Sequence, residues 1–300
     1  MVYSSEPLFG KPGSALAFIV RRFIRIVPLY WLTTTLWILI QRPAFDARTL
    51  LESYFFIPFD ASGLTIAPLF GVGWTLNFEM FFYAIFSAAI VFRRDVAVVC
   101  VTVILLFTLF ATRISHTNIT AFVFWGDPIV LEFIYGMMIA VAYRRGLRIP
   151  AWLGGILCVA GIIAIWHTMP FPPPMTKNRW LVTGAPAAMI FAGMILQPPF
   201  EFRIRWLAVL GDASYSIYLW QGMAIATIAQ LWPYGLNHIP VEDAMIVGLL
   251  ATLGLGILSF RYIEIPASKW LRNIAASSLN ASPAVISAPP EIVVTESRMR

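Results

Sequence analysis

The chain has 300 residues, of which 59% are hydrophobic and 12% are charged, and its mean hydropathy is +0.79. Soluble globular proteins usually carry about 25% charged residues, so this composition excludes that class. The apolar residues form many separate blocks, which indicates a polytopic membrane protein rather than a soluble domain on one anchor. The net charge of +6 lies in short clusters between these blocks and not along one face, so nucleic-acid binding is not expected.

Windows of about 16 to 21 apolar residues predict eight membrane spans. The blocks are continuously apolar rather than alternating, and only helices or closed barrels satisfy the backbone in lipid, so the spans are predicted to be helices. We therefore predict an all-α fold, a polytopic transmembrane helix bundle. The predicted spans are Ile26–Ile40, Trp74–Phe92, Val96–Thr112, Pro128–Tyr143, Ala151–Trp166, Trp180–Leu196, Ser214–Trp232 and Met245–Ile263.

The positions of Lys and Arg predict the orientation of this bundle. Sixteen of the 21 basic residues fall in alternate connections, on the side that holds both termini, and five fall on the other side. Cytoplasmic loops are the ones enriched in Lys and Arg, so both termini are predicted to be cytoplasmic. Residues 1–272 are predicted to form the membrane domain, and residues 273–300, rich in Ala, Ser and Pro, a disordered cytoplasmic tail.

Two carboxylates lie deep within predicted spans, where ionisable groups are costly and are often functional. Glu79 shares a helix face with Thr75 and Tyr83 at i, i+4, i+8 spacing, and this face can support a buried carboxylate. A structural hydrogen-bonding role between helices carries equal weight for Glu79. Glu132 shares a face with Gly136, where a neighbouring helix can approach closely, and for Glu132 the structural interpretation is favoured.

Arginines gather at the predicted cytoplasmic end of the first span. Arg22 and Arg25 are spaced i, i+3 and can point the same way. Planar guanidinium groups suit a phosphate-bearing ligand. The alternative, favoured on the residues alone, is a basic anchor that touches lipid headgroups.

Polar residues also mark the last two predicted spans. Ser214, Tyr218 and Gln221 follow one another at i, i+4, i+7 and form a polar stripe, for which helix packing is the more common role and a cavity lining the less common one. Glu264 closes the last span, where pairing with Arg261 is the simpler interpretation.

The sequence predicts no metal site and no hydrolase motif. It contains no Gly-rich phosphate loop, no GxSxG and no HExxH. His116, His167 and His238 all fall on the predicted outer side, where none can act as a base for a cytoplasmic substrate.

Four short segments, in this order and at membrane-helix spacing, resemble the acyltransferase 3 family of integral-membrane O-acyltransferases. The Trp-Thr-Leu-Asn-Phe-Glu-Met-Phe-Phe-Tyr run is most similar to its exopolysaccharide acetyltransferase branch. The resemblance extends from Met1 to about Arg272. The four segments are Arg21–Tyr30, Gly73–Tyr83, Leu210–Trp220 and Tyr262–Pro266.

The resemblance implies transfer of an acyl group, usually acetyl from cytoplasmic acetyl-CoA, to a hydroxyl of a bacterial exopolysaccharide or other surface glycan, or of its lipid-linked precursor. It implies a multi-pass protein of the bacterial inner membrane, in contact with membrane lipids and without a permanently bound cofactor. Arg22 and Arg25 match the family's arginine motif and would bind the donor's phosphates. Glu79, with Tyr83 on its face, would be catalytic. The residues expected to contact substrate or to be structural are Trp74, Glu132, Ser214, Tyr218 and Glu264.

The beginning of the chain departs from the family pattern. Relatives typically start with two further helices, the first of which carries an arginine and a histidine regarded as the catalytic base. Neither helix is present before Val2, and Gln221 stands where many relatives have a histidine. Either the start lies further upstream or this is a short form. A glycan or lipid transporter that uses Glu79 and Glu132, and an inactive fragment of the enzyme, are the alternatives.

Overall fold

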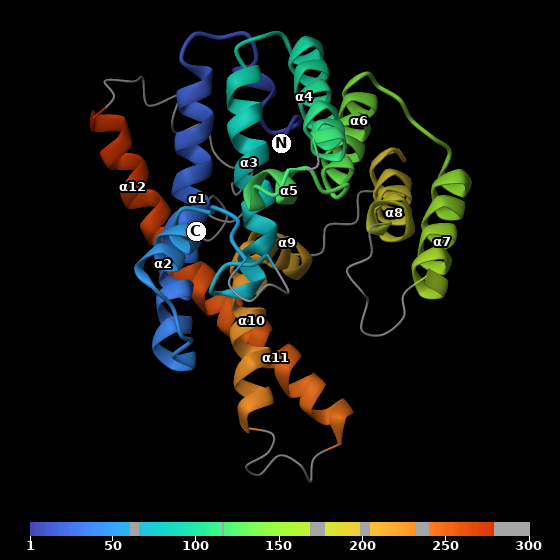
Figure 1. The fold of residues 1–300 in the computed structure, drawn as a ribbon. Coiled ribbons are helices and arrows are strands. Elements are labelled where there is room, and N and C mark those ends of the chain that lie inside the picture. Colours follow the sequence, from blue (N-terminus) through green and yellow to red (C-terminus); the bar gives the residue numbers. More distant parts are fainter. Residues whose placement is uncertain (61–65, 116, 169–177, 199–204, 232–239, 279–300) are drawn as a thin grey trace, which may run out of the picture. The chain divides into compact units, whose positions relative to one another are not determined.

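The computed structural model describes residues 1–60, 66–115, 117–168, 178–198, 205–231 and 240–278. Within these ranges the chain is helical and contains no β-strand, so the predicted all-α fold is confirmed. The elements are η1 (Glu6–Leu8), α1 (Ser14–Gln41), α2 (Ala47–Tyr54), η2 (Gly71–Gly73), α3 (Trp74–Ala89), α4 (Arg94–Ser115), α5 (Thr120–Trp125), α6 (Val130–Arg144), α7 (Ala151–Thr168), η3 (Trp180–Gly184), α8 (Ala185–Ile195), α9 (Arg205–Asp212), α10 (Ser214–Leu231), α11 (Val241–Ser259), η5 (Phe260–Glu264) and α12 (Ile265–Ser278) (Figure 1).

Five helical segments within the described residues are long and apolar enough to cross a membrane. They correspond to five of the predicted spans. The other three predicted spans appear as α3, as η3 with α8, and as α10, which are shorter or less apolar. The protein is therefore a multi-pass helical membrane protein, and the count of eight spans stays a prediction. The five segments are Ser14–Gln41, Arg94–Ser115, Thr120–Arg144, Ala151–Thr168 and Glu242–Ser277.

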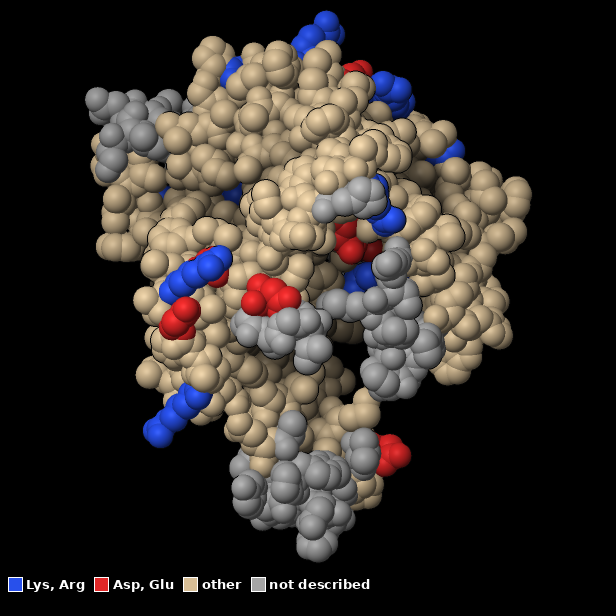
Figure 2. Space-filling view, viewed as in Figure 1, with Lys and Arg blue, Asp and Glu red and all other residues tan. Residues whose placement is uncertain are grey.

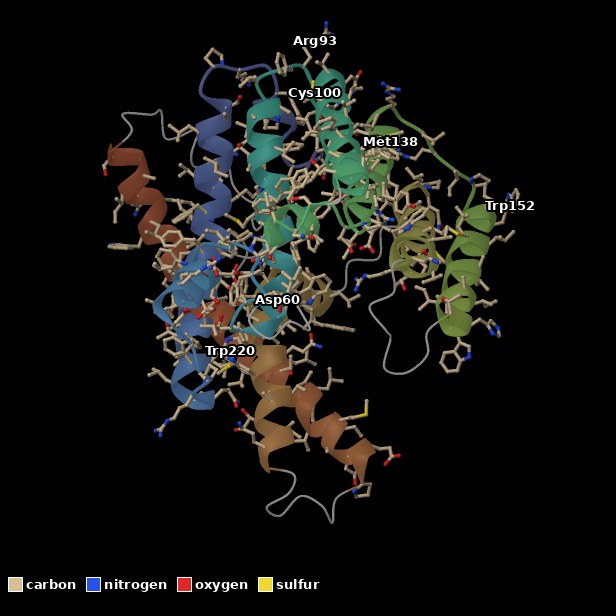
Figure 3. All side chains as sticks on the ribbon, viewed as in Figure 1. Asp60, Arg93, Cys100, Met138, Trp152 and Trp220 are labelled. Atoms are coloured by element: carbon tan, nitrogen blue, oxygen red, sulfur yellow. The ribbon has the colours of Figure 1, made fainter. Side chains whose placement is uncertain are left out.

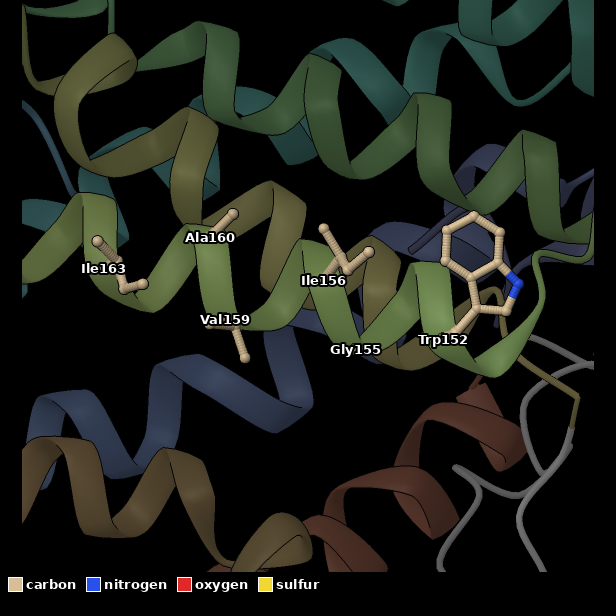
Figure 4. A pocket seen from close by; sticks show the side chains of 6 residues that line it. All are labelled: Trp152, Gly155, Ile156, Val159, Ala160 and Ile163. Atoms are coloured by element: carbon tan, nitrogen blue, oxygen red, sulfur yellow. The ribbon is translucent and has the colours of Figure 1, made fainter.

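Large apolar side chains cover much of the surface. Phe107 is 70% exposed, Ile114 76% and Trp166 81%. Figure 2 shows few charged residues among them. Such a surface is unfavourable in water and suits contact with lipid tails. An apolar groove along α7 belongs to the same surface and bears no ionisable group; its lining residues are Trp152, Gly155, Ile156, Val159, Ala160 and Ile163 (Figure 4).

The first helix begins well before the predicted span. α1 starts at Ser14 rather than Ile26, so the three arginines of the first motif lie within the helix. Pro28 is accommodated inside α1, although proline removes one backbone hydrogen bond. The arginine side chains therefore project from a helix that is otherwise mostly apolar.

The chain divides into two compact units, each described by itself. The first contains residues 1–15 and 81–202. In it, Glu6 forms ion pairs with Arg94 at 3.1 Å and with Arg144 at 3.8 Å. The guanidinium of Arg144 also lies 3.9 Å from the ring centroid of Tyr3. The N-terminal segment thus contacts two of the arginine-containing segments between spans. The charge pattern predicts that both of these segments lie on the same side of the membrane. Exposed Arg93 projects away from the turn between α3 and α4 (Figure 3).

Small residues allow α7 and α8 to pack closely in this unit. A Cβ added at Gly193 would lie 2.7 Å from the carbonyl oxygen of Gly154, and one at Gly161 would lie 2.6 Å from that of Pro186. Glycine is therefore required at both contacts, as is common where membrane helices approach each other.

The second unit contains residues 16–80 and 203–300. Here α10 and α11 pack side by side, and a Cβ at Gly256 would lie 2.6 Å from Cγ1 of Ile217. After α11 the chain makes one π-helical turn, η5, and continues as α12. The last predicted span is therefore longer than expected, and the segment predicted to be a tail from residue 273 is helical through Ser278. Residues 279–300 of that prediction lie outside the described residues.

Candidate active site

One end of α10 contacts the three other motif segments of the second unit. Tyr215, Ser216 and Tyr218 each send a side-chain hydrogen bond to a different segment. The sequence alone does not predict that these four segments lie close together. In the structure they meet at about one turn of α10. These contacts define the candidate site.

The contact with the first motif is made by Tyr215. Its hydroxyl donates to the carbonyl oxygen of Ile26 at 2.7 Å. Ile26 follows Arg25 directly, so this bond fixes α10 against the helix turn that carries the arginines. No signal in the sequence singled out Tyr215.

The contact with the second motif is made by Tyr218. Its hydroxyl donates to the carbonyl oxygen of Val72, and the hydroxyl of Thr75 lies 2.6 Å from it. Because the Tyr218 proton goes to Val72, Thr75 is the donor in the second bond. Thr75, one of the three residues of the predicted Thr75, Glu79 and Tyr83 face, therefore contacts α10.

Glycines permit the close approach at this contact. A Cβ at Gly222 would lie 2.7 Å from Cγ1 of Val72. A Cβ at Gly73 would lie 2.8 Å from the ring of Tyr30, which is fully buried and donates through its hydroxyl to the carbonyl oxygen of Ser53 at 3.0 Å. Gly73 immediately precedes Trp74, the first residue of α3, so the first and second motifs also touch each other.

The contact with the fourth motif is made by Ser216. Its hydroxyl donates to Oε2 of Glu264 at 2.6 Å, and both side chains are buried. The positive charge of Arg25 and the negative charge of Asp212 both act on the same carboxylate. Glu264 therefore does not take the simpler role predicted for it, pairing with Arg261, which is exposed. It lies in the π-helical turn η5, and such turns occur frequently at functional sites.

Four arginines of the second unit are half-buried, and the motif reasoning missed one of them. Arg21, Arg22 and Arg25 are half-buried on α1, and Arg22 lies over the ring of Phe18 at 5.3 Å. Arg272 of α12 is also half-buried, and its charge interacts with those of Arg21 and Arg25. The charge count alone had placed Arg272 on the same side as the others.

The remaining predicted site residues are distributed as follows. Trp74 is half-buried at the start of α3. Of the predicted polar stripe on α10, Tyr218 is half-buried, whereas Ser214 and Gln221 are exposed. Tyr83 is 2% exposed and lies in the part of α3 that belongs to the first unit.

Glu132 also lies in the first unit, where it is held by Arg179. The Nε of Arg179 lies 3.4 Å from Oε1 of Glu132. A Cβ at Gly184 would lie 2.8 Å from Cγ of Glu132, whereas Gly136 has open space around it. The close helix contact predicted at Gly136 is therefore wrong, and Gly184 makes it instead. The ion pair supports the structural interpretation of Glu132.

Within the described residues there is no group of His, Cys, Asp and Glu that could hold a metal ion. His167 lies in the last turn of α7, and His116 and His238 lie outside the described residues.

Comparisons with known proteins decide the family. The model of an acyltransferase domain, acyltransferase 3, matches residues 8–261. The chain belongs to the acyltransferase 3 family. It is similar to the exopolysaccharide production protein ExoZ of Rhizobium meliloti (strain 1021), with 31% identity over 262 residues that cover 83% of this chain and 80% of that protein. No solved structure matches the chain significantly.

Membership of the acyltransferase 3 family makes the chain a membrane acyltransferase, which favours the enzyme over the transporter alternative. Three of the four motifs lie within the matched residues. Glu264 and Arg272 lie beyond residue 261, so that they are buried or half-buried is known from the structure alone.

Proposed function

We propose that this protein transfers an acetyl group from acetyl-CoA to a hydroxyl of a bacterial exopolysaccharide or of its lipid-linked precursor, at the inner membrane. The observation that carries this proposal is the contact of α10 with the arginine helix, with the start of α3 and with Glu264. The similar ExoZ protein, whose name describes exopolysaccharide production, supports the choice of acceptor.

The donor would lie against the arginines of α1. Guanidinium groups form short, charge-assisted hydrogen bonds with phosphate oxygens. Arg22 and Arg25 project from a regular helix that Tyr215 fixes through Ile26, so their backbone positions are set before the donor binds. Such preorganisation lowers the entropy lost on binding.

The reaction forms a bond between the acceptor hydroxyl oxygen and the acetyl carbonyl carbon, and it breaks the bond between that carbon and sulfur. The hydroxyl loses its proton and CoA leaves as the thiol. Glu79 lies one turn after Thr75 on α3, and Thr75 contacts Tyr218, so Glu79 can orient the acceptor or assist this proton transfer. Trp74 and Thr75, on the first turn of the same helix, would shape the acceptor side.

The test is an assay of inverted membrane vesicles that contain the full-length protein, radiolabelled acetyl-CoA and purified exopolysaccharide oligosaccharides. We expect label to enter the glycan in a form that hydroxylamine releases, as an O-acetyl ester does, with equal release of CoA. Vesicles without the protein are the control. Movement of glycan across the vesicle membrane without consumption of acetyl-CoA would reject the proposal in favour of transport.

A further inference from the structure

The last helical segment of the second unit is longer than the apolar part of a membrane is thick. α11, η5 and α12 continue into one another over 36 residues, Glu242–Ser277 (Figure 1). At a rise of about 1.5 Å per residue this segment is about 54 Å long, whereas the hydrocarbon core of a bilayer measures about 30 Å. Tilted by about 40°, it still extends about 41 Å along the membrane normal. Part of the segment therefore lies outside the hydrocarbon core.

The positions of the charged residues show which part lies outside. Glu242 and Asp243 are exposed at the start of α11, and the next charged residue along the chain is Arg261. The uncharged residues 244–260 have a helical length of about 26 Å, which is close to the thickness of the core. α11 therefore accounts for the crossing by itself, and α12 begins at the headgroup level of the predicted cytoplasmic side.

The segment from η5 through α12 has one face that packs on the protein and one that does not. Glu264 and Ser268 are 8% and 7% exposed, and Glu264 is hydrogen-bonded to α10. Tyr262, Lys269 and Trp270 share the other face at i, i+7, i+8 spacing. Tyr262 is 67% exposed, Trp270 is 64% exposed, and Lys269 is also exposed. Tyr and Trp are enriched at membrane interfaces, because their rings are apolar and their polar atoms stay hydrated. We call these three residues the α12 face.

The charge at the α12 face selects its partner. Arg261 and Lys269 are exposed, and the one acidic residue between positions 261 and 278, Glu264, is buried. The accessible charge is therefore positive. A second copy of the chain, docked through the same face, would bring like charges together. Anionic lipid headgroups, in contrast, attract every basic residue that lies near the membrane surface.

We propose that the α12 face binds anionic lipid headgroups of the cytoplasmic leaflet. Lys269 extends to the phosphates, and the rings of Tyr262 and Trp270 lie at the boundary between headgroups and acyl chains. Because Glu264 immediately precedes α12, lipid bound to this face holds Glu264 in place against Ser216. Anionic lipid thus stabilises the candidate site, whichever acyl group and acceptor the site uses.

The experiment is thermal denaturation of the full chain in mixed micelles of lipid and a neutral detergent, followed by circular dichroism. Phosphatidylglycerol replaces phosphatidylcholine in graded fractions. The variants are Lys269→Gln and Trp270→Ala. Matched controls remove the same kinds of side chain elsewhere: Arg113→Gln, an exposed position on α4, and Trp166→Ala, an 81% exposed position on α7. Sedimentation of each protein at several concentrations detects dimers.

We expect phosphatidylglycerol to raise the midpoint of the wild type by about 2–4 °C, and Lys269→Gln to need about fivefold more of this lipid for half of that rise. Trp270→Ala should lose most of the rise, whereas Arg113→Gln and Trp166→Ala should retain it. In phosphatidylcholine alone, both α12 variants should match the wild type, because the side chains they remove are exposed.

Two results would overturn the inference for lipid. One is an equal effect of phosphatidylglycerol on the α12 variants and the controls. The other is a loss of stability in Lys269→Gln and Trp270→Ala that is already complete in phosphatidylcholine, since these side chains would then serve folding. Dimers of the wild type that Trp270→Ala abolishes, without any effect of phosphatidylglycerol, would make a second copy the occupant and would overturn it as well.

Discussion

Ser216 donates a hydrogen bond of 2.6 Å to the carboxylate of Glu264, 48 residues further along the chain. Ser216 is fully buried and Glu264 is 8% exposed. A buried carboxylate is costly unless it is hydrogen-bonded and close to a positive charge. Ser216 provides the hydrogen bond, so the contact connects the end of the last span to α10.

Ser216→Ala should therefore destabilise the protein. Removing the donor leaves a buried carboxylate oxygen without its hydrogen bond, which costs about 1–3 kcal/mol of unfolding free energy. The measurement is reversible unfolding in mixed micelles, followed by tryptophan fluorescence. Ser214→Ala is the control, because Ser214 is exposed on the same helix and should change stability little. Equal stability of the two variants would contradict the assigned role of the contact.

Gly73→Ala should be more harmful than Gly71→Ala. A Cβ at Gly73 would lie 2.8 Å from Cε2 and 2.9 Å from the hydroxyl oxygen of Tyr30, whereas nothing lies within 4 Å of a Cβ at Gly71. Tyr30 is fully buried and stacks on Phe56 at 4.7 Å, so it has little room to move. Overpacking of this kind costs about 1–3 kcal/mol. Thermal denaturation of both variants in detergent tests the prediction, which fails if Gly71→Ala has the lower midpoint.

Tyr218→Phe should reduce acetyl transfer without unfolding the protein. Phenylalanine cannot donate to Val72 or accept from Thr75, so the start of α3 loses its fixed position relative to α10. We expect kcat to fall about tenfold, as for the loss of about 1.4 kcal/mol of transition-state stabilisation. Gln221→Ala, an exposed change one turn further along α10, should retain full activity. A Tyr218→Phe enzyme as fast as Gln221→Ala would show that this contact does not serve the reaction.

The spans could be predicted from the sequence because continuous apolar blocks mark them independently of tertiary structure. Their limits could not. α1 begins at Ser14 and continues through Arg21, Arg22 and Arg25, whereas the charges of these arginines make the predicted apolar window begin only at Ile26. The π-helical turn at Phe260–Glu264 and the continuation into α12 depend on packing, which no local signal at Glu264 shows.

The site was partly predictable for a similar reason. Arg22, Arg25 and Glu79 stood out because charged residues are rare in apolar segments. The contact of Ser216 with Glu264 joins residues far apart in the chain, so spacing could not show it. Gly136 was selected because glycine permits close packing, but the close approach to Glu132 is made by Gly184, from another helix.

The central claim, that the arginine helix binds the donor and that Glu79 assists the chemistry, is tested most directly by the kinetics of radiolabelled acetyl transfer to exopolysaccharide. The full-length wild type is compared with Arg25→Ala, Glu79→Gln and, as control, Arg113→Ala, which removes an exposed arginine of α4. We expect Arg25→Ala to raise the KM for acetyl-CoA about tenfold or more, Glu79→Gln to lower kcat about a hundredfold, and Arg113→Ala to match the wild type. Undiminished transfer in both Arg25→Ala and Glu79→Gln would contradict the account.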